Sequence, residues 1–375
     1  MTTKKLDAEK RLQLLVQFGI FVSKERRLDS LLELLAGQVS QILNGDRCTV
    51  FLCDHKAGVL VSKVAQGMKH TEIRVPLGRS IAGLVAATGE SVNIPDAYAD
   101  QRFSPDIDRV TGYKTRAVLA VPLKNNKGEI LGVFQVLNKA GGHAFDEDDK
   151  GLLLLLASVA AGAIENAKLY EEIKRSQLET IYRLAITAEY RDQKDTARHL
   201  ENISIISYLL ATALGFSKEE AEDIKCASPL HDIGKVGVKD AVLLKPGRLN
   251  DEEQKEMRLH TLFGAKILAN AESSLLQLAH RISVCHHEKY DGSGYPKGLK
   301  GDSIPYEARI IAVADVFDAL CMPRIYKPAW PVEQAYDHIV SGSGTLFDPK
   351  VVNAFKAIYP TVRKLYGCNT VAEPA

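Results

Sequence analysis

The sequence lacks the features that would indicate a membrane protein, an exported protein or a nucleic-acid binder. No window approaches about 18 consecutive apolar residues, and the longest run, residues 152–163, is interrupted by Ser158 and Gly162. We therefore expect a packed helix there. The N-terminus is mixed and charged, without the apolar core of an export signal. The formal net charge of +1 provides no concentrated positive field for wrapping DNA.

Cysteine pairs are also absent. The chain has 6 cysteines, and none of them stands in a C-x-x-C spacing. We therefore expect reduced thiols in a cytoplasmic protein, with no thiolate metal site. The apolar share of 46% and the charged share of 25% are ordinary for a folded chain, and 375 residues suffice for two domains.

The spacing of apolar residues divides the chain into three parts. Residues 1–146 begin with helical spacing over 6–43 and continue with β-prone runs and shorter helical stretches, which predicts an α+β domain around an antiparallel sheet. The β-prone runs are 48–53, 59–65, 92–94, 117–123 and 130–137, and the helical stretches lie near 79–88 and 97–102. Residues 147–191 predict one long connecting helix. Residues 192–375 predict an all-α domain, with breaks at 246–247, 291–305 and 341–349.

The predicted connecting helix carries an apolar stripe in steps of three and four residues. Its members are Leu152, Leu155, Val159, Ala163, Tyr170, Ile173, Leu184 and Ala188, with polar Asn166 and Gln177 on the same face. Such a stripe suits a helix that pairs with a copy of itself, so we expect a homodimer. A helix packed only on its own domain is the alternative.

Histidines and acidic residues gather in the predicted all-α part. His231-Asp232 and His286-His287 are doublets, and neighbouring side chains on a helix point about 100° apart, so each member can reach a different ion. Asp195 and His199 are one helical turn apart, as two ligands of one ion should be. Imidazole with carboxylate suits iron, manganese or zinc. Two such ions can clamp a phosphate group.

Longer segments around these residues match a known family pattern. They are His231-Asp-Ile-Gly-Lys235, His286-His-Glu288, Tyr290-Asp-Gly-Ser-Gly-Tyr-Pro296, Leu244-Lys-Pro-Gly247, Ala314-Asp-Val-Phe-Asp-Ala319 and Arg324-Ile-Tyr-Lys327. Over roughly residues 180–360 the chain thereby resembles the HD-GYP family, a branch of the HD-domain phosphohydrolases. The resemblance implies an all-helical domain that holds two or three iron or manganese ions and hydrolyses cyclic di-GMP (c-di-GMP) to pGpG or GMP.

The same resemblance implies roles for individual residues. The implied metal ligands are His199, His231, Asp232, His260, His286, His287 and Asp315. Three-ion members have Glu where this chain has Asp195, one methylene shorter, so a third ion stays open. Asp232 and Lys235 would be catalytic. Lys235, Arg324 and Lys327 would bind the substrate, with Lys235 beside the reacting phosphate.

Two segments of the predicted all-α part can each be interpreted in two ways. The Gly292–Pro296 loop either contacts a diguanylate cyclase (GGDEF) domain, as the family implies, or only shapes the rim of the site. Ser228-Pro229 precedes the His231-Asp232 doublet where the family more often has helix-forming residues. Because proline is tolerated only in a first helical turn, the doublet either begins a helix or lies at a kink.

The N-terminal part carries another set of motifs. Gly78-Arg-Ser-Ile-Ala-Gly83, Thr88-Gly-Glu90, Ile94-Pro-Asp96 and Val121-Pro-Leu123 resemble the GAF family over about residues 20–165. Asn138-Lys139 followed by Phe145 resembles the signature of GAF domains that bind cyclic nucleotides, although the spacing to the acidic pair is compressed. A small ligand, a cyclic nucleotide among them, and a purely structural role in dimerisation all stay open.

Together these motifs predict a GAF sensor domain joined by a signalling helix to a metal-dependent c-di-GMP phosphodiesterase. A catalytically silent c-di-GMP receptor and a phosphodiesterase for another cyclic dinucleotide are the alternatives. The complete ligand set argues against the silent receptor. Nothing in the sequence separates the possible substrates, the native metals, the end products or the GAF ligands.

Overall fold

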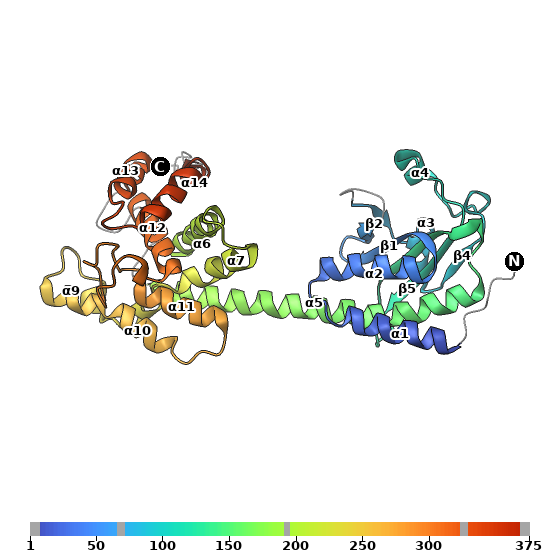
Figure 1. Ribbon diagram of the computed structural model, residues 1–375, viewed down its shortest axis with the longest axis horizontal. Coiled ribbons are helices and arrows are strands. Elements are labelled where there is room, and N and C mark those ends of the chain that lie inside the picture. The colour runs from blue at the N-terminus through green and yellow to red at the C-terminus, as the bar shows by residue number, and fades with distance from the viewer. Residues whose placement is uncertain (1–7, 66–71, 191–195, 323–328, 368–375) are drawn as a thin grey trace, which may run out of the picture. The chain divides into compact units, whose positions relative to one another are not determined.

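The computed structural model describes residues 8–65, 72–190, 196–322 and 329–367. The chain forms two compact units, Met1–Arg175 and Ser176–Ala375. Helix α5, Glu147–Glu189, begins in the first unit and ends in the second (Figure 1). The long connecting helix expected from the sequence is thus one continuous helix.

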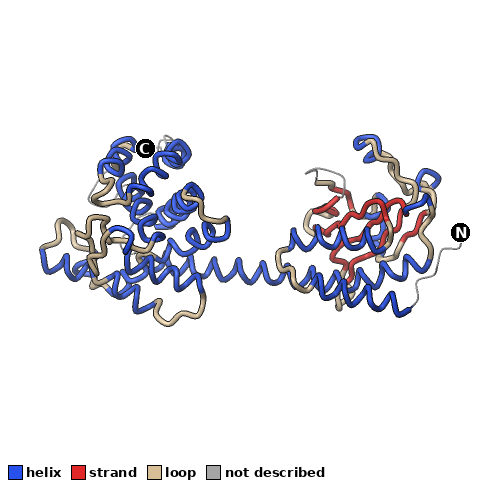
Figure 2. The backbone as a smooth tube through the Cα atoms, in the orientation of Figure 1, coloured by secondary structure: helices blue, strands red, loops and turns tan. Residues whose placement is uncertain are grey.

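The N-terminal unit is built on a six-stranded antiparallel sheet with the order β3-β2-β1-β6-β5-β4 (Figure 2). The strands are β1 Gly45–Asp54, β2 Val59–Ala65, β3 Arg74–Pro76, β4 Val92–Ile94, β5 Val118–Lys124 and β6 Ile130–Lys139. The five strands expected from β-prone runs are confirmed. Strand β3 was missed because three residues at a sheet edge are too few to show an alternating pattern.

Both faces of this sheet are covered by helices. Neighbouring residues in a strand point to opposite faces, so Val50, Leu119 and Phe134 bury one face while Phe51, Val118 and Val133 bury the other. The first face packs against α1 Ala8–Val22, α2 Leu28–Ile42 and the first half of α5. The second packs against α3 Ser80–Thr88. The stretch expected to be helical at 97–102 is only a 3-10 turn, Ala97–Ala99, and the short helix α4 follows at Asp106–Thr111.

Helix α5 explains the longest apolar run of the sequence. Within the described chain it is the helix long and apolar enough to cross a membrane, judged by length and composition alone. Its Leu153, Leu156 and Ala160 have no exposed surface, because they lie in the core of the N-terminal unit. The run is therefore a packed helix, as the interrupted pattern predicted.

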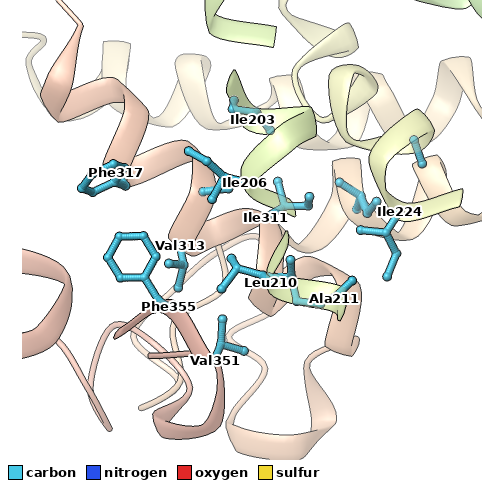
Figure 3. Close-up of a cluster of buried hydrophobic side chains, with 14 of the residues drawn as sticks. Ile203, Ile206, Leu210, Ala211, Ile224, Ile311, Val313, Phe317, Val351 and Phe355 are labelled. Atoms are coloured by element: carbon cyan, nitrogen blue, oxygen red, sulfur yellow. The ribbon is translucent and has the colours of Figure 1, made fainter. Parts of the chain in front are cut away.

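The C-terminal unit is all-helical. Its main core lies between α6 Thr196–Ala213, α7 Lys218–Ala227, α11 Ser274–Cys285, α12 Tyr306–Cys321, α13 Val332–Ser341 and α14 Pro349–Gly367. In Figure 3, Ile206 and Leu210 of α6 meet Ile311 and Phe317 of α12 and Phe355 of α14. The shorter helices α8 Asp240–Leu243, α9 Asp251–Arg258 and α10 His260–Ile267 lie between α7 and α11 in the chain. The break expected at 246–247 falls between α8 and α9, that at 291–305 falls between α11 and α12 and contains a 3-10 turn, and that at 341–349 runs from the last residue of α13 to the first of α14.

Candidate metal centre

Buried imidazole and carboxylate groups meet in the C-terminal unit. They come from the end of α5, from α6, α10 and α12, and from the residues that follow α7 and α11. In one group, the ligand atoms of Asp232, His260, His286 and His287 lie within 4.8 Å of one another; in a second group the same holds for Glu189, His199 and His231. The structure thus brings together the described histidines that the family resemblance marked as ligands.

Asp232 lies between the two groups. Its Oδ2 is 3.3 Å from His231 Nε2, whereas its Oδ1 is 3.2 Å from His260 Nε2 and 3.4 Å from His286 Nε2. Asp315 Oδ1 is 3.8 Å from Nε2 of both His199 and His231. A carboxylate with its two oxygens facing different groups has the geometry needed to bridge two ions.

The histidine rings are held by hydrogen bonds through their other nitrogen. Nδ1 of His231 is 3.0 Å from the carbonyl of Ser228, and Nδ1 of His260 is 2.7 Å from that of Met257. His286 Nδ1 lies 3.1 Å from the carbonyl of Ile282. Because a carbonyl can only accept, each Nδ1 carries a proton, and Nε2 is the nitrogen whose lone pair is available when the ring is neutral. Metal-ligating histidines are usually fixed in this way.

Several buried polar atoms of these groups have no hydrogen-bond partner. They are Nε2 of His199, His231, His260 and His286, Oδ1 of Asp232 and both carboxylate oxygens of Glu189. A buried polar atom without a partner is costly, and a cation among these atoms would satisfy several at once. The donors are nitrogen and oxygen, which fits iron, manganese or zinc. The two clusters are consistent with a multi-metal site.

Asp318 is a fully buried carboxylate that supports His199. Its Oδ2 is 2.5 Å from His199 Nδ1, and its Oδ1 accepts from Asn202 Nδ2 at 2.7 Å and from the hydroxyl of Tyr366. Burial and the Asp318 charge raise the pKa of Tyr366, so its hydroxyl stays a donor. The sequence analysis did not assign this role. Its signal was the three-residue step from Asp315, which puts both carboxylates on one side of α12.

Lys235 adds a buried positive charge beside the Asp232 carboxylate. Its Nζ is 2.9 Å from Asp232 Oδ2. Burial alone would raise the pKa of Asp232, but Lys235 and His231 outweigh it and hold that pKa well below its usual range. Asp232 is therefore ionised at neutral pH.

The histidines differ in their charge state. Burial alone would lower the pKa of His231, but Asp232 and Asp315 outweigh it and raise the value to about 10. His231 therefore holds a proton that an incoming cation must displace. For His287, burial and the neighbouring His286 both lower the pKa well below its usual value, so this ring is neutral and ready to bind a cation.

The two doublets do not lie within α-helices, which corrects the expectation from the sequence. Helix α7 ends at Ala227, and the 3-10 turn Ser228–Leu230 follows, with Pro229 in its first turn. Asp232 then begins a second 3-10 turn, Ile233–Gly237. The proline has no N–H to continue the α-helical pattern, so the kink is the alternative that the structure adopts. The pair at 286–287 likewise comes just after α11 ends at Cys285.

The loop at 292–296 is fixed against the first group. The Glu288 carboxylate is buried and accepts from the backbone N–H groups of Lys297 at 2.8 Å and Leu299 at 2.9 Å. The ring centroid of Tyr295 is 4.8 Å from that of His287. A Cβ on Gly294 would lie 2.3 Å from the backbone nitrogen of Lys289, so only glycine fits there. The loop therefore belongs to the wall of the site.

Three of the residues expected at the metal or substrate site are not among those that the structure describes. Asp195, Arg324 and Lys327 lie outside the described residues. Glu189, in contrast, was not expected at the site. It precedes His199 by ten positions in the sequence, a spacing that matches no helical ligand pattern.

The N-terminal unit has a pocket of its own. It encloses about 430 Å³, with Phe51, Ile73 and Leu137 on its apolar wall and the cations Arg47 and Arg79 beside them. Asp106 and Asp108 also line it, so the pocket suits a small molecule that has an apolar body and polar or charged groups.

Comparisons with known proteins follow the same division. Residues 27–164 match the model of the GAF domain, and residues 176–351 match that of the HD domain. The cyclic di-GMP phosphodiesterase response regulator RpfG of Xanthomonas campestris is 46% identical over 49% of this chain and 48% of that protein. A cyclic di-GMP phosphodiesterase of Thermotoga maritima is 42% identical over 53% of this chain and 54% of that protein.

A further relative has a different named substrate. The 3'3'-cGAMP-specific phosphodiesterase 2 of Vibrio cholerae is 39% identical over 60% of this chain and 43% of that protein. The chain thus spans about half the length of the curated relatives it matches. From its motifs, its fold and these matches, the chain carries a GAF domain followed by an HD domain of the type found in cyclic di-GMP phosphodiesterases.

Proposed function

We propose that this chain is a metal-dependent phosphodiesterase of the HD-GYP type that hydrolyses c-di-GMP to pGpG, GMP or both. The observation that carries the proposal is the pair of buried imidazole–carboxylate groups, 4.8 Å or less across, that meet at Asp232. The relatives at 46% and 42% identity that are named for this activity support the substrate.

The proposed ions are two or three per chain, with iron or manganese favoured by the donor set. The residues proposed to hold them are Asp195, His199, His231, Asp232, His260, His286, His287 and Asp315. When bound, such ions neutralise phosphate charge and make water a nucleophile at neutral pH.

The other proposed roles belong to cationic side chains. Lys235, which is buried beside Asp232, keeps a fixed positive charge where negative charge develops on the phosphodiester. Arg324 and Lys327 are proposed to bind the second phosphate or a guanine base, and the planar guanidinium of Arg324 suits a bidentate contact.

A second candidate substrate is a mixed cyclic dinucleotide of guanosine and adenosine. The Vibrio cholerae relative named for 3'3'-cGAMP is 39% identical and supports this candidate. The two substrates share the phosphodiester ring and differ in one base. The silent-receptor alternative is disfavoured, because the described donor set is suited to catalysis.

The decisive experiment measures metal content and turnover in the same preparation. We expect protein purified without oxygen to contain at least two transition-metal ions per chain and to convert c-di-GMP faster than 3'3'-cGAMP. Elemental analysis and chromatography of the products measure both quantities. Protein with two ions and no turnover of c-di-GMP would contradict the proposal.

In the Arg324→Ala variant, affinity for c-di-GMP should fall about 10- to 100-fold with metal content unchanged.

We further propose a cytoplasmic homodimer that pairs through the GAF domain and α5. On α5, Leu155, Val159, Tyr170 and Ile173 of the apolar stripe are 50%, 37%, 46% and 56% exposed. Asn166 and Gln177 are exposed on the same helix, where polar residues would fix the register of a pair. Sedimentation of the full chain should give a dimer, and a monomer at micromolar concentration would refute the pairing.

The proposed regulation acts through the GAF domain. The pocket beside Arg47 and Arg79 would receive a small effector, whose binding shifts the equilibrium between two settings of α5 by its differential affinity for them. The loop at 292–296 is proposed to contact a GGDEF domain. If a GGDEF-domain protein no longer co-purifies with the chain when Tyr295 is replaced by alanine, the contact is supported, and unchanged co-purification of the two proteins would refute it.

A further inference from the structure

We propose that Glu189 is itself a metal ligand, so that the last residue of α5 forms part of the metal centre. It would bind the same ion as His199 and His231. This inference rests on the proposed function for the presence of a metal ion. It adds a ligand that the sequence motifs do not include and ties the ion to the helix that leaves the GAF unit.

The surroundings of the Glu189 carboxylate carry the argument. The residue has no exposed surface, and its Oε2 is 3.8 Å from His199 Nε2. Its ligand oxygen, His199 Nε2 and His231 Nε2 all lie within 4.8 Å of one another. Carboxylate and imidazole bind transition metals at about 2.0–2.2 Å, so two ligand atoms of one ion lie at most about 4.4 Å apart, and the 3.8 Å between Glu189 Oε2 and His199 Nε2 meets this limit.

No hydrogen bond explains the burial of this carboxylate. Both of its oxygens are buried without a hydrogen-bond partner, and so are the two Nε2 atoms that face them. The imidazole Nδ1 atoms of His199 and His231 are engaged by Asp318 and by the Ser228 carbonyl, which leaves the two Nε2 atoms as the donors available to a cation. Buried donor atoms from three residues, close together and without hydrogen-bond partners, are the arrangement expected of a metal site.

The end of α5 that carries Glu189 is packed into the C-terminal unit. Ala185 and Ala188 in the last turns of α5 are buried in the C-terminal unit, with 0% and 4% exposed surface. The hydroxyl of Thr196, at the start of α6, lies 3.5 Å from the Glu189 carbonyl. The end of α5 is thereby packed next to α6, the helix that carries His199.

The alternative role for Glu189 is a counter-charge for Lys235. The ammonium group of Lys235 lies against Asp232 Oδ2 and contributes to the field at Glu189. A counter-charge would stabilise the fold equally with and without a metal ion, whereas a ligand would destabilise the metal-free fold and stabilise the metal-bound one. This difference separates the two roles.

The test compares Glu189→Gln with Glu179→Gln in the full-length protein. Glutamine keeps the size of the side chain and removes its charge. Glu179 lies on the same helix with its side chain 65% exposed, so its substitution is the matched control. Each protein is treated with a chelator and titrated with Mn²⁺, with binding followed by calorimetry and elemental analysis, and melting followed with and without Mn²⁺.

We expect Glu189→Gln to bind one Mn²⁺ fewer per chain, or to bind it at least about tenfold more weakly, while Glu179→Gln matches the wild type. Without Mn²⁺, Glu189→Gln should melt at or above the wild-type temperature, because an amide is less costly to bury than a lone carboxylate. With Mn²⁺ the order should reverse.

Three outcomes would overturn the inference. They are wild-type Mn²⁺ stoichiometry and affinity in Glu189→Gln, a loss of stability of equal size with and without Mn²⁺, and a wild-type protein that binds no Mn²⁺. The assays contain no nucleotide. If the expected pattern holds but the wild type turns over no cyclic dinucleotide, the proposed substrate is wrong and the role of Glu189 stands.

Discussion

The Asp232→Ala variant is expected to lose phosphodiesterase activity and bound metal together. Asp232 Oδ1 faces His260 and His286 while Oδ2 faces His231, so one substitution removes a donor from both groups. Loss of metal-derived stabilisation of the transition state costs about 4 kcal/mol or more, which is about a thousandfold in rate. Initial rates with c-di-GMP and elemental analysis of the same preparation measure the two losses.

The control for this variant is Asp337→Ala. Asp337 is an exposed carboxylate on α13, so its removal changes the net charge by the same amount away from the site. It should leave rate and metal content unchanged. Full activity in Asp232→Ala, or a rate loss with normal metal content, would contradict the bridging role.

The second large effect is expected from Gly234→Ala, which should destabilise the C-terminal unit. A Cβ on residue 234 would lie 1.9 Å from the carbonyl oxygen of His260 and 2.3 Å from the backbone nitrogen of Gly264. Overpacking a core usually costs about 1–3 kcal/mol, and here no side chain can turn away because both obstacles are main-chain atoms. We therefore expect the free energy of unfolding to fall by about 3 kcal/mol or more.

This variant should also weaken metal binding. Gly234 lies two residues after Asp232, and the obstructing atoms belong to α10, whose first residue is His260. The added methyl group would push the 3-10 turn Ile233–Gly237 away from α10. This movement would separate Asp232 from His260, two ligand candidates of the first group. Denaturant unfolding and Mn²⁺ titration measure both effects.

Gly151→Ala is the matched control. No heavy atom lies within 4 Å of a Cβ at this helical position, so alanine should stabilise α5 by about 0.5–1 kcal/mol. A change in stability of less than about 0.5 kcal/mol in Gly234→Ala would show that the two segments are less closely packed than described.

Most of the fold could be predicted because its signals are local. Alternating apolar residues placed five strands, and the three- and four-residue steps placed α5 within two residues of its observed ends. The short strand β3 could not be predicted, since its pairing with β2 is a tertiary contact. The 3-10 turns around His231 also escaped prediction. Sequence patterns mark the break at Pro229 but not the conformation that follows it.

The candidate site could be predicted in part for a similar reason. The motifs identified His231, Asp232, His260 and Asp315, which the structure brings close together. They could not identify the carbonyls that orient the rings, because any residue type supplies a carbonyl. Glu189 was missed because its approach to His199 depends on how α5 and α6 pack, and not on a spacing within one helix.

The communication proposed to run along α5 must be reciprocal. Its Leu153 and Leu156 lie in the core of the GAF unit, and the same helix ends at Glu189. If an effector in the GAF unit changes the affinity of the ion bound by Glu189, thermodynamic linkage requires that ion to change the affinity of the effector by the same factor. The GAF domain would then respond to the metal supply of its own enzyme, and a demetallated chain would bind its effector with a different affinity from a loaded one.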